Sequence, residues 1–371
     1  MNPILFDANE TTFATNGIGR LTNAISCAVT EERNGIYELD MVYPMKGLNF
    51  SAIQTDRIIY AIPADGKAPQ PFRVYYISAP LNGEVEISAQ HISYQLKWTI
   101  VNAFTATSAS GALNGFSAHL ADTGQSFPFS FTTDVTRAGT FSNSFPQDIR
   151  SLLMGQEGSV LDVYGGEYEW DKYQVILHTS RGQDNGVSIK YGKNLTDIQQ
   201  DANIGETYTG VAAYWKSETD GTTTVVQSNP NVILADTASN FPFHRIKAID
   251  ASGDFTPPEG SETGWTPSQS DLTTWANNYI AANDIGVPEV SIDVSFQPLW
   301  QTEEYKNIAP LERVNLCDTV TVQFPALGVN AKAKVVRTVY NVLNERYDEI
   351  EIGTLKQTLA ETIINLSKGG V

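Results

Sequence analysis

The chain has 371 residues, of which 41% are hydrophobic and 18% are charged, so it is long enough for several domains with ordinary cores. Its 42 acidic and 24 basic residues give a formal net charge of −18, which argues against a protein that clamps nucleic acid. The sequence shows neither an apolar run of the roughly 18 residues that a membrane helix needs nor a signal peptide, which predicts folding in a cytoplasm without membrane insertion.

The first hundred residues predict antiparallel strands. A hairpin over residues 25–43 alternates apolar and polar residues and turns at Asn34-Gly35. A second hairpin over 72–89 turns at Asn82-Gly83. Four or five strands in so short a stretch indicate a small barrel or sandwich.

After about residue 90 the pattern changes to mixed helix and strand. Residues 108–120 place apolar side chains at helical spacing, and Ser144-Phe145-Pro146 has the cap and early proline that open a second helix. Strands are expected over 173–179 and 187–191, joined through a turn at 184–186. This middle part is therefore expected to be α+β.

The last third returns to strands. Asp220-Gly221 predicts another hairpin, and Asp271 is expected to cap a helix that ends near Gly286. The segment 290–296 has the clearest strand alternation in the chain, and a last helix is expected over 354–367.

An internal repeat connects the two ends of the chain. Residues 56–64 and 318–326 match without a gap, with an aspartate at the start and Pro-Ala at the end of each. The same register aligns Leu81-Asn82 with Leu343-Asn344. Two copies with other material between them predict two similar modules, in which the matched segments occupy equivalent strands and Pro63 and Pro325 lie at the same strand end.

The sequence contains no recognisable catalytic, cofactor or metal pattern. None of the four histidines has metal-ligand spacing, and no Gly-x-Ser-x-Gly elbow is present. Cys27 and Cys317 lie in apolar strand patterns, so both are expected to be buried free thiols in mid-strand. Two alternatives stay open: acid pairs at Glu167/Glu169/Asp171 or Glu303/Glu304 for glycoside hydrolysis, and the aromatic turn 164–170 as a sugar platform.

Several runs resemble a known family. They lie in family order along nearly the whole chain, at 4–10, 16–19, 30–39, 89–94, 157–167 and 178–195. Through them the chain resembles the phage minor structural, tail-associated (Tal-like, prophage endopeptidase tail) proteins of long-tailed phages. That family is similar to the baseplate hub of contractile phages and to the spike-carrying hub of type VI secretion.

The resemblance implies a trimeric structural hub at the virion tail tip. Each subunit would carry two similar β-barrels, so that three subunits present six to a sixfold tail ring. The ring would close the tail channel and open for genome ejection. The implied partners are further copies of the chain, the distal tail protein ring, the tape-measure protein and receptor-binding proteins, while phage DNA passes without specific binding.

Together these observations predict a mainly β chain with α+β insertions, no cofactor, no metal and no catalysis of its own. The expected division is a first β-barrel at 1–95, an α+β domain at 96–185, a second barrel at 186–240 plus 286–353, a loop and helix at 241–285, and a C-terminal helix at 354–371. In this family a hydrolase would lie C-terminal to these residues. A peptidoglycan-degrading tail enzyme and a cell-wall carbohydrate-binding adhesin are the alternatives.

Overall fold

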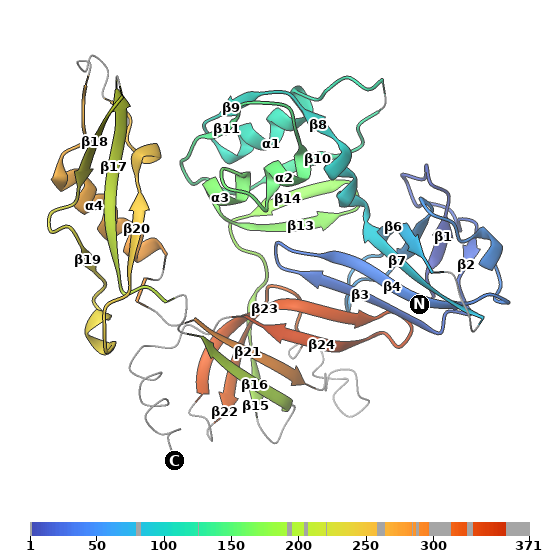
Figure 1. The fold of residues 1–371 in the computed structure, drawn as a ribbon. Coiled ribbons are helices and arrows are strands. Elements are labelled where there is room, and N and C mark those ends of the chain that lie inside the picture. The colour runs from blue at the N-terminus through green and yellow to red at the C-terminus, as the bar shows by residue number, and fades with distance from the viewer. Residues whose placement is uncertain are drawn as a thin grey trace. The chain divides into compact units, whose positions relative to one another are not determined.

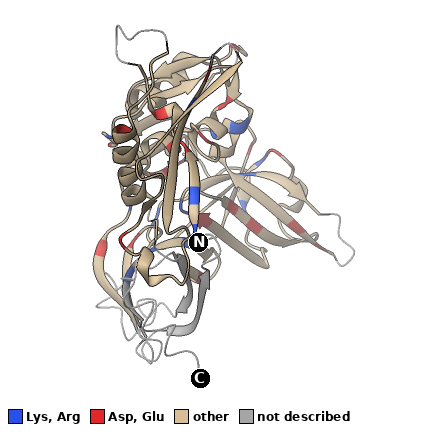
Figure 2. Ribbon diagram, turned by 60° about the vertical axis from the view of Figure 1, so that its left-hand side comes forward, with Lys and Arg blue, Asp and Glu red and all other residues tan. Residues whose placement is uncertain are grey.

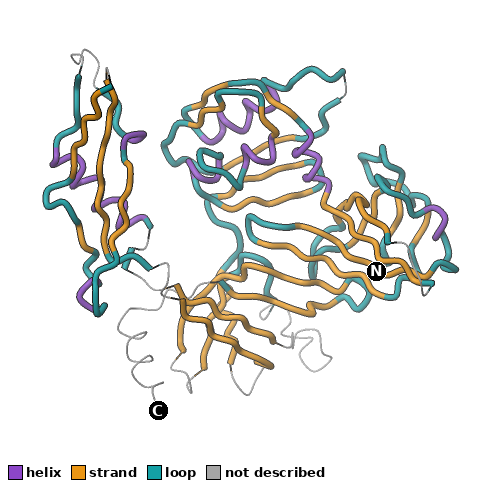
Figure 3. Tube along the Cα trace, viewed as in Figure 1, coloured by secondary structure: helices purple, strands orange, loops and turns teal. Residues whose placement is uncertain are grey.

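A computed structural model describes residues 2–78, 83–124, 126–190, 195–203, 207–219, 221–257, 264–283, 285–286, 289–296, 313–324 and 329–353. It divides into two compact units, which are described separately (Figures 1 and 3). Unit 1 comprises Met1–Ile198, Asp293–Gln323 and Lys332–Gly353, and unit 2 is built mainly on Gln199–Ile292.

A large sheet dominates unit 1, and β16, β21, β22 and β23 also contribute residues to unit 2. Its strands are β1 (Ile4–Phe6), β2 (Gly19–Arg20), β3 (Ser26–Glu32), β4 (Tyr37–Pro44), β5 (Ile58–Ala61), β6 (Gln70–Ile77), β7 (Glu84–His91), β15 (Asp184–Lys190), β16 (Leu195–Asn203), β21 (Glu289–Phe296), β22 (Thr319–Phe324), β23 (Val329–Asn341) and β24 (Arg346–Ile352). The strand order is β16-β21-β24-β23-β3-β4-β7-β6-β5-β1-β2, with β22 on β23 and β15 on β22. The mainly β prediction is confirmed, but the strand order shows no closed barrel in the described part of the chain.

The alternation in the sequence becomes the two faces of this sheet. Along β4, Tyr37, Leu39, Met41 and Tyr43 are buried while the residues between them are partly or fully exposed. The predicted hairpin between β3 and β4 is confirmed, and Asn34 adopts the positive φ that its turn requires.

Between β7 and β15 lies a mixed α/β region. Its elements are the 3-10 helix η2 (Ile92–Trp98), β8 (Ile100–Val101), β9 (Phe104–Ala106), α1 (Ala109–Ala118), β10 (Ser130–Thr133), β11 (Phe141–Asn143), β12 (Gln147–Asp148), α2 (Ile149–Leu153), α3 (Val160–Tyr164), β13 (Glu167–Asp171) and β14 (Gln174–His178). The ring of Phe116 on α1 packs within 6 Å of the rings of Phe104, Phe131 and Phe141, which forms the centre of this core.

Two local predictions in this region are wrong. The second helix is capped by Asp148, whose carboxylate accepts from the Ser151 amide at 2.9 Å, and Ser144 and Pro146 precede it. Asp184 to Gly186 belong to β15, which pairs in parallel with β22, instead of forming the predicted connection between the strands at 173–179 and 187–191. A parallel partner so distant in sequence leaves no local turn signal.

Unit 2 contains a small sheet and a helix. Its elements are β17 (Gly210–Thr219), β18 (Thr222–Gln227), β19 (Ile233–Leu234), β20 (Ile246–Asp250) and α4 (Gln269–Ala282). Leu272 and Ala276 on α4 are buried in its core. Ser268 caps α4, and Asp271 completes a capping box with it, so the helix begins earlier than an Asp271 cap predicts.

The internal repeat corresponds to two strand groups of the same pattern. In the first group the order is β3-β4-β7-β6-β5, and in the second it is β16-β21-β24-β23-β22. Asp56 precedes β5 and Cys317 precedes β22, and the two residues have positive φ angles of 68° and 70°. Their amides donate to the carbonyls of Val74 at 2.8 Å and Val335 at 2.9 Å.

The structural match lies one residue away from the sequence match. A bulge follows Val74 in the pairing of β6 with β7, and another follows Val335 in the pairing of β23 with β24. Asp56 therefore corresponds to Cys317 instead of Asp318, although both segments do lie in equivalent strands. Pro325 and the predicted helix 354–367 lie outside the described residues.

Candidate functional site

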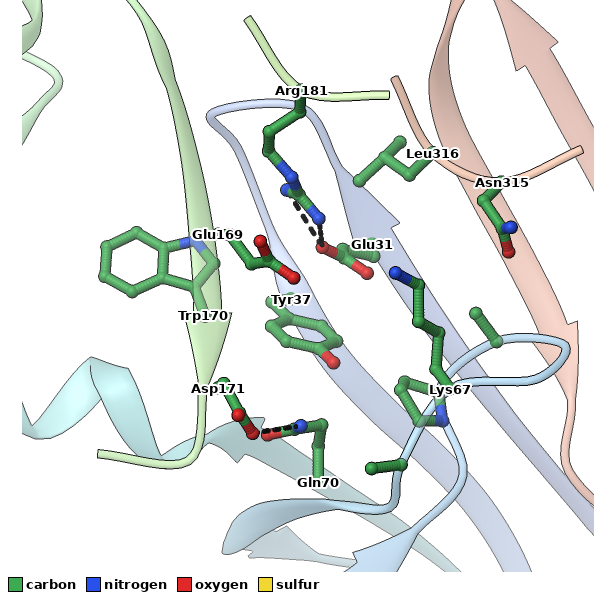
Figure 4. Close-up of a pocket in the computed structure, with 13 residues that line it drawn as sticks. Glu31, Tyr37, Lys67, Gln70, Glu169, Trp170, Asp171, Arg181, Asn315 and Leu316 are labelled. Atoms are coloured by element: carbon green, nitrogen blue, oxygen red, sulfur yellow. Dashed lines mark hydrogen bonds and ion pairs between the residues drawn. The ribbon is translucent and has the colours of Figure 1, made fainter. Parts of the chain in front are cut away.

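A pocket of about 130 Å³ lies in unit 1 where four segments meet (Figure 4). They are the hairpin β3–β4, the loop between β5 and β6, the segment from β13 to Arg181, and the approach to β22. The side chains labelled there are Glu31, Tyr37, Lys67, Gln70, Glu169, Trp170, Asp171, Arg181, Asn315 and Leu316. The residues that line the pocket therefore come from both strand groups and from the α/β region.

A buried ion pair stands at its centre. Arg181 Nη2 lies 3.4 Å from Glu31 Oε1, and their side chains are 11% and 10% exposed. Burial raises the pKa of Glu31, and the charge of Arg181 offsets part of that rise. Burial is the largest single influence on Arg181 and opposes its charged form, but the Glu31 carboxylate and the other negative groups nearby together outweigh it, so the Arg181 pKa is raised. Removing one partner would leave the other buried without compensation.

A second set of contacts centres on Glu167 of β13. Lys334 Nζ on β23 donates to both carboxylate oxygens, at 2.8 and 2.9 Å, and also to Ser180 Oγ at 2.7 Å. The Arg181 amide donates to Glu167 Oε2 at 2.6 Å, and Arg33 Nη1 lies 3.5 Å from Glu167 Oε1. This carboxylate thus ties the α/β region to the second strand group.

The other two acids of the predicted carboxylate trio also have partners. His178 Nε2 lies 2.9 Å from Glu169 Oε2, and Gln70 Nε2 donates to Asp171 Oδ1 at 2.9 Å. The predicted trio is therefore used to connect segments. Glu303 and Glu304, the second predicted pair, lie outside the described residues.

The aromatic turn proposed as a sugar platform is part of a core. Tyr164, Tyr168 and Trp170 are 2%, 0% and 5% exposed. The Tyr168 hydroxyl donates to the Leu153 carbonyl at 3.0 Å, and the Arg150 guanidinium lies 4.6 Å from the Trp170 ring. Rings buried to this extent cannot stack on a sugar in solution.

Both cysteines are buried free thiols, as predicted. Burial raises the pKa of each, that of Cys317 to about 12, so neither is a reactive thiolate near neutral pH. Cys317 lies in the turn before β22, which corrects its predicted mid-strand position. The described residues include no cluster of three metal-ligating side chains, and none of their helices is long and apolar enough to cross a membrane.

Sequence reasoning did not single out Arg181 or Lys334. Arg181 is 150 positions from Glu31, and Lys334 is 167 positions from Glu167. Charged residues so far apart have no pairing signal in a single sequence. The one local sign that the chain packs closely near Arg181 is the glycine at position 182. Its φ of +76° and the nearby Cys317 backbone exclude a side chain there.

Residues 261–363 match the model of the prophage endopeptidase tail family. The fold is similar to that of a prophage tail protein, gp18, from Listeria monocytogenes, with a TM-score of 0.59, 14% identity and 99% of each chain covered. A 43 kDa tail protein of prophage MuSo2 from Shewanella oneidensis has a TM-score of 0.57 and 10% identity, with 96% of this chain and 97% of that one covered. A tail protein from Neisseria meningitidis has a TM-score of 0.55 and 8% identity, with 96% of each chain covered.

Among curated protein sequences, none matches the chain. The resemblance to phage tail proteins that the sequence predicts is confirmed by the family match and by the shared fold.

Proposed function

We propose that this chain, whose residues 261–363 carry the prophage endopeptidase tail signature and whose fold is that of prophage tail proteins, is a structural hub of a phage tail tip. Three copies would form a ring that closes the tail channel and opens for genome ejection. The observation that carries this proposal is the pair of matching strand groups within one chain.

Symmetry explains why the duplication supports a hub. A ring of three subunits can match a sixfold partner only if each subunit presents two similar faces. The groups β3-β4-β7-β6-β5 and β16-β21-β24-β23-β22 supply two similar sets of strands. In the assembled hub, each group would contribute one barrel facing the distal tail protein ring.

Two ion pairs support a rigid connection between those two faces and the α/β region. Glu31 on β3 is paired with Arg181, and Lys334 on β23 is paired with Glu167. Both strand groups are thereby tied to the same α/β region. A hub that transmits a signal from receptor-binding proteins to the channel needs such fixed connections, and it needs no catalytic site.

The acidic balance suits a channel for DNA. The chain carries a formal net charge of −18, and Figure 2 shows acidic residues spread over many elements of the described structure. Three copies would repel DNA phosphates, so a genome leaving the tail would not be trapped by adsorption. The end of the tape-measure protein would occupy the same channel before ejection.

The first test is location. Immunogold labelling of purified tails with antibodies against the chain should mark the tail tip, and deletion of the gene should yield particles that adsorb or eject poorly. Label confined to the tail shaft, or a chain that is absent from virions, would contradict the hub.

The second test separates the hub from an enzyme or an adhesin. Zymography on purified cell walls should give no clearing, and a glycan array should show no binding at micromolar concentration. Clearing of cell-wall material would favour a peptidoglycan-degrading enzyme, and saturable sugar binding would favour an adhesin.

A further inference from the structure

The outer edge of β13 is covered by a side chain where a neighbouring strand would otherwise lie. β13 pairs with β14 on its other side, and the backbone groups of alternate residues point away from β14. The Asn34 side chain donates to the Gly166 carbonyl at 2.9 Å and accepts from the Tyr168 amide at 2.8 Å. Asn34 therefore supplies the hydrogen bonds that a peptide group of another strand would supply.

Further along this edge, Trp170 has no such partner. The Tyr168 carbonyl accepts from Arg181 Nη1, and the Lys172 amide donates to Gln70 Oε1 at 2.7 Å. Trp170 lies between these two contacts, and by alternation its amide and carbonyl also point away from β14. No residue in the described part of the chain bonds to either group. The edge thus presents one backbone donor and one backbone acceptor side by side.

These two backbone groups face the pocket described above. Trp170 is one of the residues that line it. The Trp170 ring packs instead on the Arg150 guanidinium at 4.6 Å, and Figure 4 shows this ring on the opposite side of β13 from Glu169 and Tyr37. The backbone of Trp170 is therefore the part of this residue that contributes to the pocket.

The Tyr37 hydroxyl is a second polar group of the pocket without a partner. Tyr37 is 2% exposed, its ring stacks on that of His91, and no hydrogen bond to its hydroxyl is made by the described residues. A tyrosine hydroxyl buried to this extent usually has a hydrogen-bond partner. An unpartnered hydroxyl, amide and carbonyl at one pocket indicate a ligand that carries both a donor and an acceptor.

The neighbours of Trp170 limit how much of a ligand can pair with it. The contacts of Arg181 and Gln70 occupy the edge on either side, so one residue of an incoming peptide fits between them. A continuous strand would have to displace both side chains. This arrangement favours the end of a peptide over a segment that passes through.

Charge distinguishes which end of a peptide fits. Two basic and three acidic side chains line the pocket, and they are Lys67, Arg181, Glu31, Glu169 and Asp171. Arg181 is paired with Glu31, and Lys67 is exposed at the pocket mouth. The lining is therefore negative on balance, which favours an ammonium group over a carboxylate.

We propose that this pocket binds the free amino terminus of a peptide. The terminal ammonium donates to the Trp170 carbonyl and to the Glu169 carboxylate, and the first carbonyl of the peptide accepts from the Trp170 amide. His178 Nε2 lies 2.9 Å from Glu169 Oε2, which leaves Oε1 for the ammonium. The Tyr37 hydroxyl accepts from the same ammonium. Capture of a chain end by backbone groups is a known mode of peptide recognition.

The test observes the Trp170 amide directly. The chain has six tryptophans, and Trp170 is the only one that follows a glutamate, so combined labelling with carbonyl-13C glutamate and 15N tryptophan isolates its NMR signal without a substitution. The probe is alanine N-methylamide, which carries an ammonium and one peptide group. N-acetylalanine N-methylamide lacks the ammonium, and N-acetylalanine carries a carboxylate instead.

The ammonium probe should shift the Trp170 signal saturably and bind at least about tenfold more tightly than either acetylated compound, a ratio that corresponds to about 1.4 kcal/mol. A Trp170 signal that does not move up to the highest soluble probe concentration would overturn the proposal. Equal or tighter binding of an acetylated compound would overturn it as well.

Substitutions in the pocket test the two side chains. Glu169→Gln removes the charge that faces the ammonium and should weaken binding of the probe by about tenfold, as should Tyr37→Phe, which keeps the ring on His91. Glu218→Gln is the matched control, because it removes one exposed negative charge in unit 2. Circular dichroism verifies folding.

Glu218→Gln should bind the probe as the unmodified chain does. Unchanged binding in Glu169→Gln or in Tyr37→Phe, or an equal loss in Glu218→Gln, would contradict this arrangement. The pocket and the edge of β13 carry this inference, so its outcome is independent of whether the chain is found at tail tips.

Discussion

The groups β5-β6-β7 and β22-β23-β24 share a backbone pattern, but few residues are identical at structurally equivalent positions. Both begin at a positive-φ residue, both make the same amide-to-carbonyl bond into the middle strand, and both have a bulge at the following residue. Yet the sequence match is offset by one residue from the structural one. Backbone pairing and burial of one face define such a repeat, and individual identities are a weaker guide to it.

Their environments also differ, and that difference is informative. The middle strand β23 has β3 beside its last residues, whereas the equivalent edge of β6 is uncovered. The first group also ends in a buried histidine, while β24 ends in isoleucine. The following predictions test these contrasts, beginning with the largest expected effect.

The ion pair that anchors β3 should be the most sensitive point. Arg181→Met leaves the Glu31 carboxylate buried without its partner and should lower the free energy of unfolding by about 3–5 kcal/mol. Arg346→Met is the matched control, because Arg346 and Asp348 form an exposed pair on β24 whose loss should cost at most about 1 kcal/mol. Urea denaturation measures both.

The double variant Glu31→Leu with Arg181→Met should recover much of the loss, since no unpaired charge then stays buried. Equal, small losses for Arg181→Met and Arg346→Met would show that the Glu31–Arg181 pair does not anchor the sheet.

A proline at equivalent positions of the two middle strands should separate the covered edge from the uncovered one. Thr338→Pro removes an amide that faces β3 and leaves a buried acceptor there, which should cost about 1–3 kcal/mol. Ile77→Pro should change the stability of dilute, unassociated protein by less than about 0.5 kcal/mol. Thermal and urea denaturation at low protein concentration would show the difference, and equal losses would mean that the two edges are not distinct.

The close approach of the chain at Gly182 should be tested against a glycine with the same φ. Gly182 and Gly221 both have φ of +76°, but a Cβ on Gly182 would lie 2.1 Å from the Cys317 carbonyl oxygen, whereas at Gly221 nothing lies within 4 Å. Gly221→Ala should cost about 1–2 kcal/mol from backbone strain alone. Gly182→Ala should cost clearly more, and a smaller loss than in Gly221→Ala would place the second group further from the α/β region.

Acid should loosen the first group before the second. Burial, and then the charge of Arg150, hold the pKa of His91 well below its ordinary 6.5. As the pH falls below about 6.5, His91 takes up a proton in the unfolded chain but not in the folded one. The free energy of unfolding should therefore drop by up to about 1.4 kcal/mol per pH unit. Above that pH the contribution is fully present.

His91→Gln should remove this slope, and His244→Gln, at an exposed position, should retain it. Urea denaturation at about pH 7 and about pH 5.5 provides the comparison. An unchanged slope in His91→Gln would assign the acid sensitivity to another group.

Local features were predictable from the sequence, and distant pairings were not. The hairpin β3–β4 follows from alternation and an Asn-Gly turn, and α4 follows from its apolar spacing. The pairing of β15 with β22 and the contacts of Arg181 and Lys334 join residues more than a hundred positions apart. Nothing local distinguishes Glu167, which binds Lys334, from a catalytic acid. The structure was needed to show that it connects segments.

The most direct test of the central claim is electron cryomicroscopy of purified tail tips at a resolution that traces strands. The account predicts three copies in a ring with pseudo-sixfold symmetry, to which each copy contributes both of its strand groups. A tail tip that lacks the chain, or an arrangement of the chain without this pseudo-sixfold symmetry, would contradict it.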